Sequence, residues 1–506
     1  MTASPMSRRS RIALAAAALG YAAVLLYRFR TVPDGLVNDQ AEELLRGLIL
    51  ISERRLEVLT FVVGNSAETL WLYVLGLSAA LLRPSVLALV LPSALAAAAT
   101  AWATTRFFVE RRPDAPWWIP FLLVAGSPWL FAYGRSGFRA ITAPLCLALA
   151  ALLLQLAEGR PGRRWPYAAA GGILGVSIYG YTAARLLPVA LAAAFAIVLL
   201  RDREGRRARA HAALACAAGF TAASIPNLVF LAGHPVEFFV RGGYSVVGDT
   251  QGKLVNLLAT AALPLYYPHR YRFVWGEAHV LDGFSASIAG SGIDPVPLVA
   301  GLLALVGLVV TLRRGRDLTA LFLVATHVLT IVLLGPLGPS LTRVLLLVPV
   351  FAFYAAVGTL ELARTPRARI VAGAVLALVA AAAITSYFRL LSDPQRPARE
   401  YVGDVQTAMG ERARVLAASG RVLAVVSDDE NVVRTLAWGT DTSVVEFRLR
   451  PFDVREVLQK FPARILLVET YPVFDPWHPP GFVETPSPDP RWRELAAEPA
   501  IPPSGP

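Results

Sequence analysis

Long apolar runs, separated by short polar segments, fill the first 390 residues of the chain. Eleven of them are roughly as long as a membrane-crossing helix. They lie at 12–27, 85–107, 116–133, 140–157, 166–180, 186–200, 210–231, 295–312, 318–334, 341–361 and 370–388. A soluble domain has no place to bury so many apolar helices. We therefore predict an all-α polytopic membrane protein with about eleven transmembrane helices.

Two shorter apolar segments, 70–82 and 254–267, decide the direction of every later span. Both fall short of the roughly 20 residues that a spanning helix needs. If neither crosses, five arginine clusters lie on the same side of the membrane as the N-terminus. These clusters are Arg106/Arg111/Arg112, Arg160/Arg163/Arg164, Arg201 to Arg209, Arg313/Arg314/Arg316 and Arg364/Arg367/Arg369. The positive-inside bias places that side in the cytoplasm and both short segments in the outer interface.

The first apolar run follows a basic stretch and could pass for a signal peptide. Arg28-Phe29-Arg30 is a poor cleavage site, since small residues are needed there, so we predict an uncleaved first span. We expect a multi-pass protein of the bacterial plasma membrane, with the N-terminus in the cytoplasm and the C-terminal domain outside.

Composition supports this class. Of 506 residues, 55% are hydrophobic and 17% are charged, and the formal net charge is +12. Nearly all positive charge is arginine, because Lys253 and Lys460 are the only lysines. The arginines fall in short loops, where they act as topology signals and contact lipid headgroups, so we expect membrane lipids and no nucleic acid as partners. Cys146 and Cys216 lie inside apolar runs, which disfavours a disulfide or a cysteine metal site.

The composition changes after Tyr387. We assign residues 1–389 to a transmembrane domain with long outer loops at 28–84 and 232–294, and 390–506 to a small extracytoplasmic α/β domain. Strands are predicted at 422–427, 443–448 and 463–469, and helices at 431–438 and 453–461. The tail after Pro472 is proline-rich and is expected to be irregular. The domain has no glycine-rich phosphate loop, so we assign it no nucleotide.

The predicted topology gathers carboxylates and arginines on the outer face. The first outer loop supplies the candidate general base Asp39, and candidate substrate-binding residues follow in this and later loops. They are Glu42, Glu43, Glu68, Arg135, Arg139, Tyr181, Arg185, Arg241 and Arg343. Guanidinium groups bind phosphate through two parallel hydrogen bonds, and a carboxylate can accept a hydroxyl proton. One outer site would therefore suit a phosphate-bearing lipid beside an alcohol or amine acceptor.

Each feature also has a structural interpretation. Acidic residues at the start of a helix are favoured by its dipole, which alone accounts for the cluster around Asp39. Any single outer arginine can snorkel from a helix end to the headgroups. Several on the outer face are harder to explain this way, because the positive-inside bias disfavours arginine in short outer loops. The run Tyr266 to Trp275 is more typical of an aromatic interface belt than of a substrate groove.

Several short motifs occur in an order that resembles the GT-C superfamily of membrane glycosyltransferases. They are Asn38-Asp39-Gln40-Ala41-Glu42, Glu68-Thr-Leu-Trp-Leu-Tyr73, Ser127-Pro128-Trp129 followed by Arg135, Tyr181-Thr182-Ala-Ala-Arg185, and Arg343 to Pro349. The similarity covers roughly the first 390 residues and is closest to the branch of protein O-mannosyltransferases and aminoarabinose lipid A transferases. Gln40 stands where the family has a second acid, and Ala140 where some relatives have one.

The resemblance implies transfer of a sugar from a polyprenyl-phosphate-linked donor to a lipid, glycan or protein acceptor outside the cytoplasm. Asp39 would take the acceptor's proton as the anomeric carbon is attacked with inversion, and arginines would stabilise the departing phosphate. Gln40 leaves Asp39 as the only acid carried over from the family's pair, and Ala140 weakens a metal site. A divalent metal stays compatible with the sequence, and no cofactor is assigned.

Three other functions compete with this one. A transporter or lipid flippase would show repeated halves and polar residues near mid-membrane, and the chain shows no clear repeat and polar residues at one face. Another lipid-linked saccharide enzyme, such as a polymerase or ligase, would use outer arginines without the early Asp39 loop. A non-catalytic relative would use its outer domain to bind a partner.

Overall fold

A computed structural model of the protein divides the chain into two compact units. The first comprises residues 1–27, 56–71 and 90–390, and the second 28–55, 72–89 and 391–506. The structure describes residues 6–32, 38–62, 65–160, 162–234, 250–262, 295–315, 317–337, 341–392, 404–418, 423–427, 430–440, 442–446, 465–469, 482–485 and 492–497.

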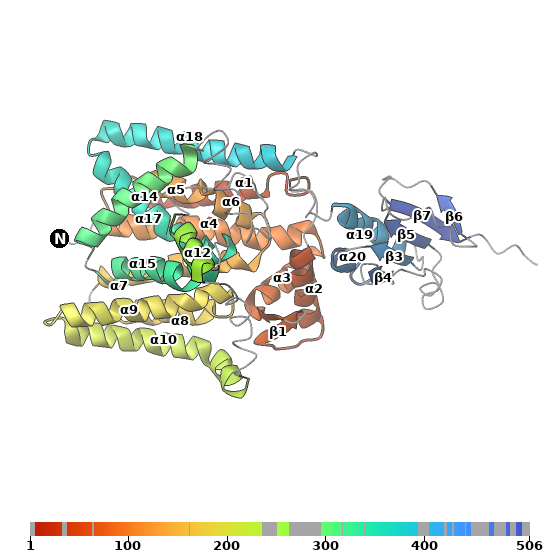
Figure 1. Cartoon of the computed structure of the whole chain (residues 1–506), viewed down its shortest axis with the longest axis horizontal. Coiled ribbons are helices and arrows are strands. Elements are labelled where there is room, and N and C mark those ends of the chain that lie inside the picture. Colours follow the sequence, from red (N-terminus) through yellow and green to blue (C-terminus); the bar gives the residue numbers. More distant parts are fainter. Residues whose placement is uncertain are drawn as a thin grey trace, which may run out of the picture. The chain divides into compact units, whose positions relative to one another are not determined.

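Unit 1 is a bundle of long apolar helices (Figure 1). Helix α8 packs against α7 and α10, α9 against α15, and α14 against α17. The helices are α1 (Arg8–Leu26), α4 (Val86–Arg111), α5 (Trp118–Ala125), α6 (Pro128–Gly134), α7 (Thr142–Glu158), α8 (Trp165–Ser177), α9 (Leu186–Arg201), α10 (Arg206–Gly233), α12 (Thr250–Ala262), α14 (Pro295–Arg314), α15 (Leu318–Leu329), α17 (Val348–Leu362) and α18 (Pro366–Ser392). Short helical turns precede or extend several of them: η1 (Arg139–Ile141), η2 (Thr182–Arg185), η3 (Thr330–Leu334), η4 (Gly335–Leu337), α16 (Leu341–Val344) and η5 (Leu345–Leu347).

The helices confirm a multi-pass membrane protein. Among the described residues, seven helical segments are long and apolar enough to cross a membrane. Every one of the eleven predicted ranges is helical, although the range 116–133 is broken into α5 and α6. The break has a local cause, because the Ser127 hydroxyl accepts the backbone N–H of Leu130 and Pro128 occupies the first turn of α6. The total of eleven spans stays a prediction.

The two short apolar segments form short helices. Helix α3 (Thr69–Leu82) has 14 residues and α12 has 13, both below the roughly 20 needed to span a bilayer. That neither of them crosses the membrane stays a prediction. Residues 263–267 of the second segment lie outside the described residues.

Close helix packing in unit 1 depends on small residues. A Cβ atom at Gly307 of α14 would lie 1.7 Å from the backbone oxygen of Tyr354, and one at Gly358 of α17 would lie 2.1 Å from that of Leu303. Because glycine has no Cβ atom, the backbones of α14 and α17 can approach closely at these two positions, as small residues commonly allow between membrane helices.

The loops that carry the arginine clusters meet at one end of this bundle. Four ion pairs join the ends of different helices: Arg111–Asp317 at 2.5 Å, Arg209–Glu158 at 3.3 Å, Arg314–Glu361 at 3.1 Å and Arg369–Asp114 at 3.7 Å. The Glu158 carboxylate also accepts the backbone N–H groups of Leu318 and Thr319 at the start of α15. The predicted common side of these clusters therefore corresponds to one physical end of the bundle.

Unit 2 contains α2 (Asn38–Ser52), most of α3, and the C-terminal α/β fold. Its sheet has the order β4-β3-β5-β7-β6, with β3, β4 and β5 parallel and the last two strands antiparallel. The strands are β3 (Leu423–Ser427), β4 (Thr442–Glu446), β5 (Ile465–Glu469), β6 (Phe482–Thr485) and β7 (Trp492–Ala497). Helices α19 (Asp404–Ala417) and α20 (Glu430–Leu436) pack on each other and on these strands.

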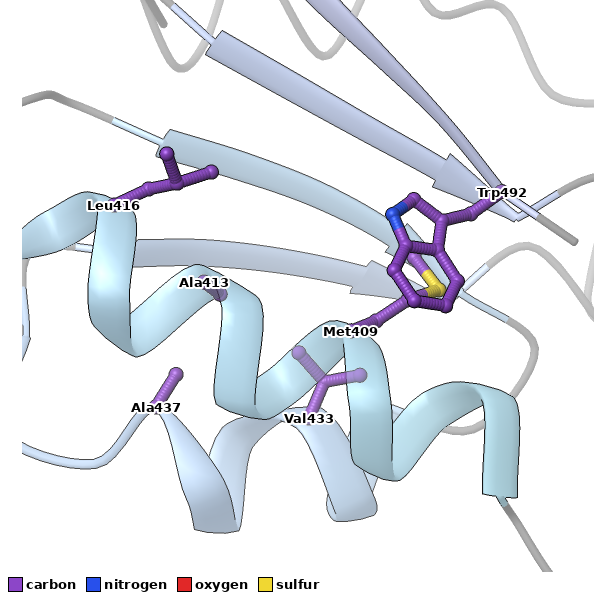
Figure 2. Packing of buried hydrophobic residues seen from close by; sticks show 6 residues of the cluster. All are labelled: Met409, Ala413, Leu416, Val433, Ala437 and Trp492. Atoms are coloured by element: carbon purple, nitrogen blue, oxygen red, sulfur yellow. The ribbon is translucent and has the colours of Figure 1, made fainter. Parts of the chain in front are cut away.

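The core of the α/β fold lies between this helix pair and the sheet. Figure 2 shows Met409 of α19, Val433 of α20 and Trp492 of β7 gathered there. The prediction of an irregular tail was wrong, because β6 and β7 form part of the sheet. Burial of Trp492 and Leu495 gives β7 an apolar contact with the core, and the prolines at 486, 488 and 490 fall between the two strands. The domain boundary near residue 390 stays a prediction, and unit 2 adds two segments of the first outer loop to the C-terminal residues.

Candidate functional site

A short hairpin in unit 1 carries Glu68. Strand β1 (Leu59–Val62) pairs antiparallel with β2 (Asn65–Glu68), and Glu68 is its last residue. Helix α3 starts at Thr69, whose hydroxyl donates to the backbone oxygens of Glu57 and Val58 at 2.8 and 2.9 Å. The abrupt change from strand to helix fixes Glu68 at the junction, where its side chain is 1% exposed.

Two arginines and a threonine surround the Glu68 carboxylate. Arg185 lies 3.3 Å from its Oε1 and Arg139 lies 3.9 Å from its Oε2. The Thr182 hydroxyl donates to Oε1 as well. A buried carboxylate is stable only when it is paired and hydrogen-bonded. Oε1 is hydrogen-bonded to Thr182 and Arg185, and Oε2 is paired with Arg139 at ion-pair distance. The structure thus brings together three predicted site residues that are separated by up to 117 positions in the chain.

Backbone contacts lock the loops around Glu68. The Trp71 indole donates to the backbone oxygen of Gly137 at 2.7 Å. The backbone N–H of Leu70 donates to the backbone oxygen of Tyr179 at 3.1 Å. The Ser93 hydroxyl joins the same loop, since it accepts the N–H of Gly137 and donates to the backbone oxygen of Gly134. Gly137 has φ +75°, a conformation that favours glycine. Both arginine loops are therefore held in place by residues that do not carry charge.

Three of the predicted arginines occur in short helical turns that lead into long apolar helices. Arg139 opens η1 before α7, Arg185 closes η2 before α9, and Arg343 lies on α16 before α17. The turn η5, which follows α16, contacts η1, so the Arg343 segment lies near that of Arg139. Tyr181 precedes η2 and is buried. A turn before a helix places its arginine at the N-terminal end of that helix.

Arg135 is engaged elsewhere. Its guanidinium donates to the backbone oxygens of Leu25 and Tyr27, the latter at 2.8 Å, at the C-terminal end of α1. Its carbon Cζ also lies 4.9 Å from the ring centroid of Phe388. A cation is favoured at a helix C-terminus, where carbonyl groups have no partner within the helix. These contacts give Arg135 a structural role, and its role in substrate binding stays a prediction.

The other predicted acids belong to unit 2. Asp39 lies in the first turn of α2, and Glu42 on the same helix forms a 3.0 Å ion pair with Arg46. Glu43 is buried. The pair with Arg46 is the ordinary i,i+4 pairing of a helix surface, so it accounts for Glu42 without a substrate.

Arg241 and the run Tyr266 to Trp275 lie outside the described residues. Sequence reasoning missed the contacts of Thr182, Trp71 and Ser93, although Thr182 and Trp71 lie inside two of the quoted motifs. Ser93 gave a weak signal, as a polar residue within an apolar run. Neither motif spacing nor hydropathy indicates which backbone group such a side chain reaches.

The Glu68 cluster carries two positive charges and one negative charge. Arg185 keeps 22% of its side chain exposed and Arg139 keeps 8%, so an anion would meet Arg185 first. Among the described residues Glu68 is the one carboxylate of this cluster, and it faces two guanidinium groups, an arrangement that favours an anion over a divalent cation. Within the part of the chain that the structure describes, no three His, Cys, Asp or Glu side chains form a metal-binding group. The chemistry that this cluster supports is binding of phosphate or carboxylate.

Comparison with known proteins gives structural matches. No family model and no curated protein matches the sequence. The structure is similar to ArnT from Cupriavidus metallidurans bound to undecaprenyl phosphate, with TM-score 0.60, 12% identity, and 96% of this chain and 97% of that chain covered. It is also similar to the archaeal oligosaccharyltransferase AglB from Archaeoglobus fulgidus in complex with an inhibitory peptide and a dolichol-phosphate, with TM-score 0.51, 13% identity, and 91% and 69% covered.

Proposed function

On the premise that the chain has the fold of the GT-C membrane glycosyltransferases, which include ArnT and AglB, we propose that it transfers a sugar. The donor is a polyprenyl-phosphate-linked sugar and the acceptor is a lipid, glycan or protein on the outer face of the membrane. The single observation that carries the proposal is the buried Glu68 carboxylate held between Arg139 and Arg185.

This cluster supports a donor-phosphate site for two reasons. Glu68 fixes two guanidinium groups in position without neutralising both, so the cluster keeps a net positive charge. Guanidinium groups that are already oriented need little reorganisation when charge develops on a phosphate. The partly exposed Arg185 would contact the phosphate, and Arg139 would support it from the buried side. Arg343 and Tyr181, on or beside neighbouring turns, are proposed to complete the donor site.

The proposed reaction is a single inverting displacement. Asp39 accepts the proton of the acceptor hydroxyl or amine, the acceptor atom bonds to the anomeric carbon, and the bond from that carbon to the phosphate oxygen breaks. The electron pair of the broken bond stays on the polyprenyl phosphate, which leaves with one more negative charge than it had in the donor. The arginines therefore stabilise the transition state more than the ground state, which lowers the barrier.

The proposal is tested first by following the lipid donor. Purified protein in lipid is incubated with an extract of polyprenyl-linked sugars and an envelope acceptor fraction, and mass analysis follows each lipid species. We expect loss of one polyprenyl-phosphate sugar, release of the free polyprenyl phosphate and a matching mass gain in an acceptor. Movement of the lipid-linked sugar from one leaflet of the vesicle membrane to the other, with its sugar–phosphate bond intact, would instead indicate a flippase.

A matched pair of variants tests the phosphate site. Arg185→Gln removes a guanidinium 3.3 Å from Glu68, and Arg209→Gln removes one at the same distance from Glu158. The two side chains are 22% and 28% exposed, so the substitutions are similar in structural terms. We expect Arg185→Gln to weaken polyprenyl-phosphate binding and turnover, and Arg209→Gln to leave both near the wild-type values. Equal effects of the two would contradict a donor site at Arg185.

A further inference from the structure

Helix α2, which carries Asp39, is built into the same compact unit as the C-terminal α/β fold. Unit 2 joins residues 28–55 and 72–89 to residues 391–506. Within it, α2 packs against α20. Both helices contribute buried apolar side chains, namely Ala41, Leu44 and Leu48 on α2 and Val432 and Leu436 on α20. The helix that carries the proposed base is therefore held by the C-terminal fold.

A specific polar contact fixes this packing. The Thr435 hydroxyl of α20 donates to the backbone oxygen of Ala41 at 2.9 Å, and the contact is buried. Ala41 lies two positions after Asp39 in the first turns of α2. Hydrophobic packing alone tolerates sliding, whereas a buried hydroxyl must meet its acceptor or lose a hydrogen bond. Thr435 therefore sets the register between the two helices next to Asp39.

Two further contacts hold α2 in the unit. A Cβ atom at Gly47 of α2 would lie 2.2 Å from the backbone oxygen of Leu72, so the α2 and α3 backbones touch. At the far end of α3, Arg414 of α19 donates to the backbone oxygen of Pro84 at 3.1 Å. The pair α2–α3 is thus attached to the C-terminal fold at Ala41 and at Pro84.

We propose that the C-terminal α/β fold positions the first turn of α2 for catalysis, and that Thr435 is a positioning residue that acts through Asp39. The inference rests on the proposed function, in which Asp39 is the general base. It assigns the C-terminal fold a part in the reaction through the placement of α2. A misplacement of about 1 Å can cost roughly a hundredfold in rate, so a small shift of this turn is sufficient.

The test compares three variants of the full chain in lipid. Thr435→Val keeps the shape of the side chain and removes the hydroxyl, and Thr435→Ser keeps the hydroxyl. The comparison variant Thr440→Val removes a hydroxyl that donates to the backbone oxygen of Ala437, three positions earlier, at 2.5 Å. With the lipid-linked sugar that the wild type consumes, we expect Thr435→Val to lower kcat about tenfold or more. Donor affinity should stay near the wild-type value, and Thr435→Ser should restore most of kcat.

A measurement without substrate accompanies the kinetics. Hydrogen–deuterium exchange of the peptide covering 38–52 should be faster in Thr435→Val than in the wild type, and unchanged in Thr440→Val. If Thr435→Val does not fold, Arg414→Gln is used, because it removes the second attachment and leaves α20 intact. Wild-type kcat in Thr435→Val overturns the proposal, as does wild-type kcat in Arg414→Gln where Thr435→Val does not fold.

A double variant separates this inference from the proposed function. In Asp39→Asn, a positioning residue has no base left to position, so Thr435→Val should cause no further loss of kcat. An undiminished further loss would show that Thr435 acts elsewhere, which overturns the inference and leaves the function in place. Wild-type turnover of Asp39→Asn alone would remove Asp39 as base, which overturns this inference and the proposed proton transfer but leaves the proposed transfer of a sugar in place.

Discussion

Arg185 lies 3.3 Å from the carboxylate of Glu68, and the Glu68 side chain is 1% exposed. The two residues come from different segments of the chain, and each is fixed by contacts of its own loop. Glu68 sits between a hairpin and α3, and Arg185 ends the turn that starts α9. A buried carboxylate thus orients a partly exposed guanidinium at a helix end. We expect this arrangement to contribute both to stability and to ligand binding, and the two contributions can be separated by substitution.

We expect both Glu68→Gln and Glu68→Ala to destabilise the protein and to weaken donor binding, because the carboxylate that orients Arg139 and Arg185 is lost. The glutamine can still accept the Thr182 hydroxyl but leaves two guanidinium groups without their negative partner. Loss of one partner of a buried ion pair typically costs about 3–5 kcal/mol, so the folded protein should unfold at a lower temperature. Thermal unfolding and binding of polyprenyl phosphate are measured on the same samples.

A control for this prediction is Glu42→Gln. Glu42 also pairs with an arginine, Arg46, but the pair lies on a helix surface with side chains 15% and 27% exposed. Such pairs contribute only about 0.3–0.5 kcal/mol. If Glu42→Gln and Glu68→Gln had equal effects, the buried cluster would have no special role.

Asp39→Asn should lower turnover with little change in stability or donor affinity. Asparagine keeps the size of the side chain and removes the proton acceptor, and general-base catalysis typically contributes about 10²–10⁴-fold. Glu43→Gln, on the next turn of α2, should cost much less turnover. Rates are measured with saturating donor, and near-normal turnover of Asp39→Asn would contradict its assignment as base.

Arg135→Gln should act on stability first. Arg135 donates to carbonyl groups at the C-terminus of α1, and hydrogen bonds to charged groups contribute about 1.5–3 kcal/mol each. Its substitution should lower the unfolding temperature in detergent, and Arg135→Lys should restore part of the loss. At a temperature where the variant is folded, donor affinity tests the predicted role of Arg135 in substrate binding separately from its role in stability. A loss of donor affinity without a loss of stability would indicate that Arg135 binds the donor phosphate.

Local sequence predicted the elements that depend on local composition. The eleven apolar ranges are helical because a bilayer core requires every backbone group to be bonded within its own segment. Strands β3 to β5 were predicted from short β-branched runs such as Leu423–Ser427, and they form the parallel part of the sheet. The arginine clusters were assigned to one side from charge alone, and their loops do meet at one end of unit 1.

Contacts between distant residues were not predictable in this way. Thr435 and Ala41 are 394 positions apart, and a threonine on a short helix gives no sign of its acceptor. Arg135 and Arg185 are the same residue type in two loops that were both predicted to lie on the outer face, yet one caps a helix and the other pairs with Glu68. Which of these an arginine does depends on the neighbouring elements in space. The sequence can name Glu68, Arg139 and Arg185 as candidate site residues. Their proximity to one another is visible only in the fold.

Asp317 gives a prediction on pH. Burial opposes ionisation of its carboxyl, but hydrogen bonding and charge from Arg111, with the backbone N–H of Ala320, outweigh this and hold the pKa below its ordinary value of 3.8. A lowered pKa in the folded state means that the ionised group stabilises the protein above the ordinary pKa and that this contribution is lost as pH falls through the folded value.

The measurement is the unfolding temperature in detergent from pH 7 downward, for the wild type and Asp317→Asn. Asparagine can still cap α15 but cannot form the charged pair with Arg111. We expect the variant to be less stable at pH 7 and the difference to shrink below about pH 4, where the wild-type carboxyl becomes protonated. A difference that is constant across this range would show that the charge of Asp317 does not stabilise the fold.

The membrane topology gives the last prediction. Helix α3 has 14 residues, too few to span a bilayer, so residues before and after it should lie on the same side. Single cysteines are placed at Leu56 and Arg83, which flank α3, and at Arg163 in the loop of an arginine cluster, in a background where Cys146 and Cys216 are alanine. All three positions are exposed. In intact cells an impermeant thiol reagent should label the first two and not the third. Opposite labelling at Leu56 and Arg83 would show that α3 crosses the membrane, and every later span would then change direction. Labelling at Arg163 alone would place the arginine clusters outside, against the positive-inside bias, and would move the Glu68 cluster to the cytoplasmic face.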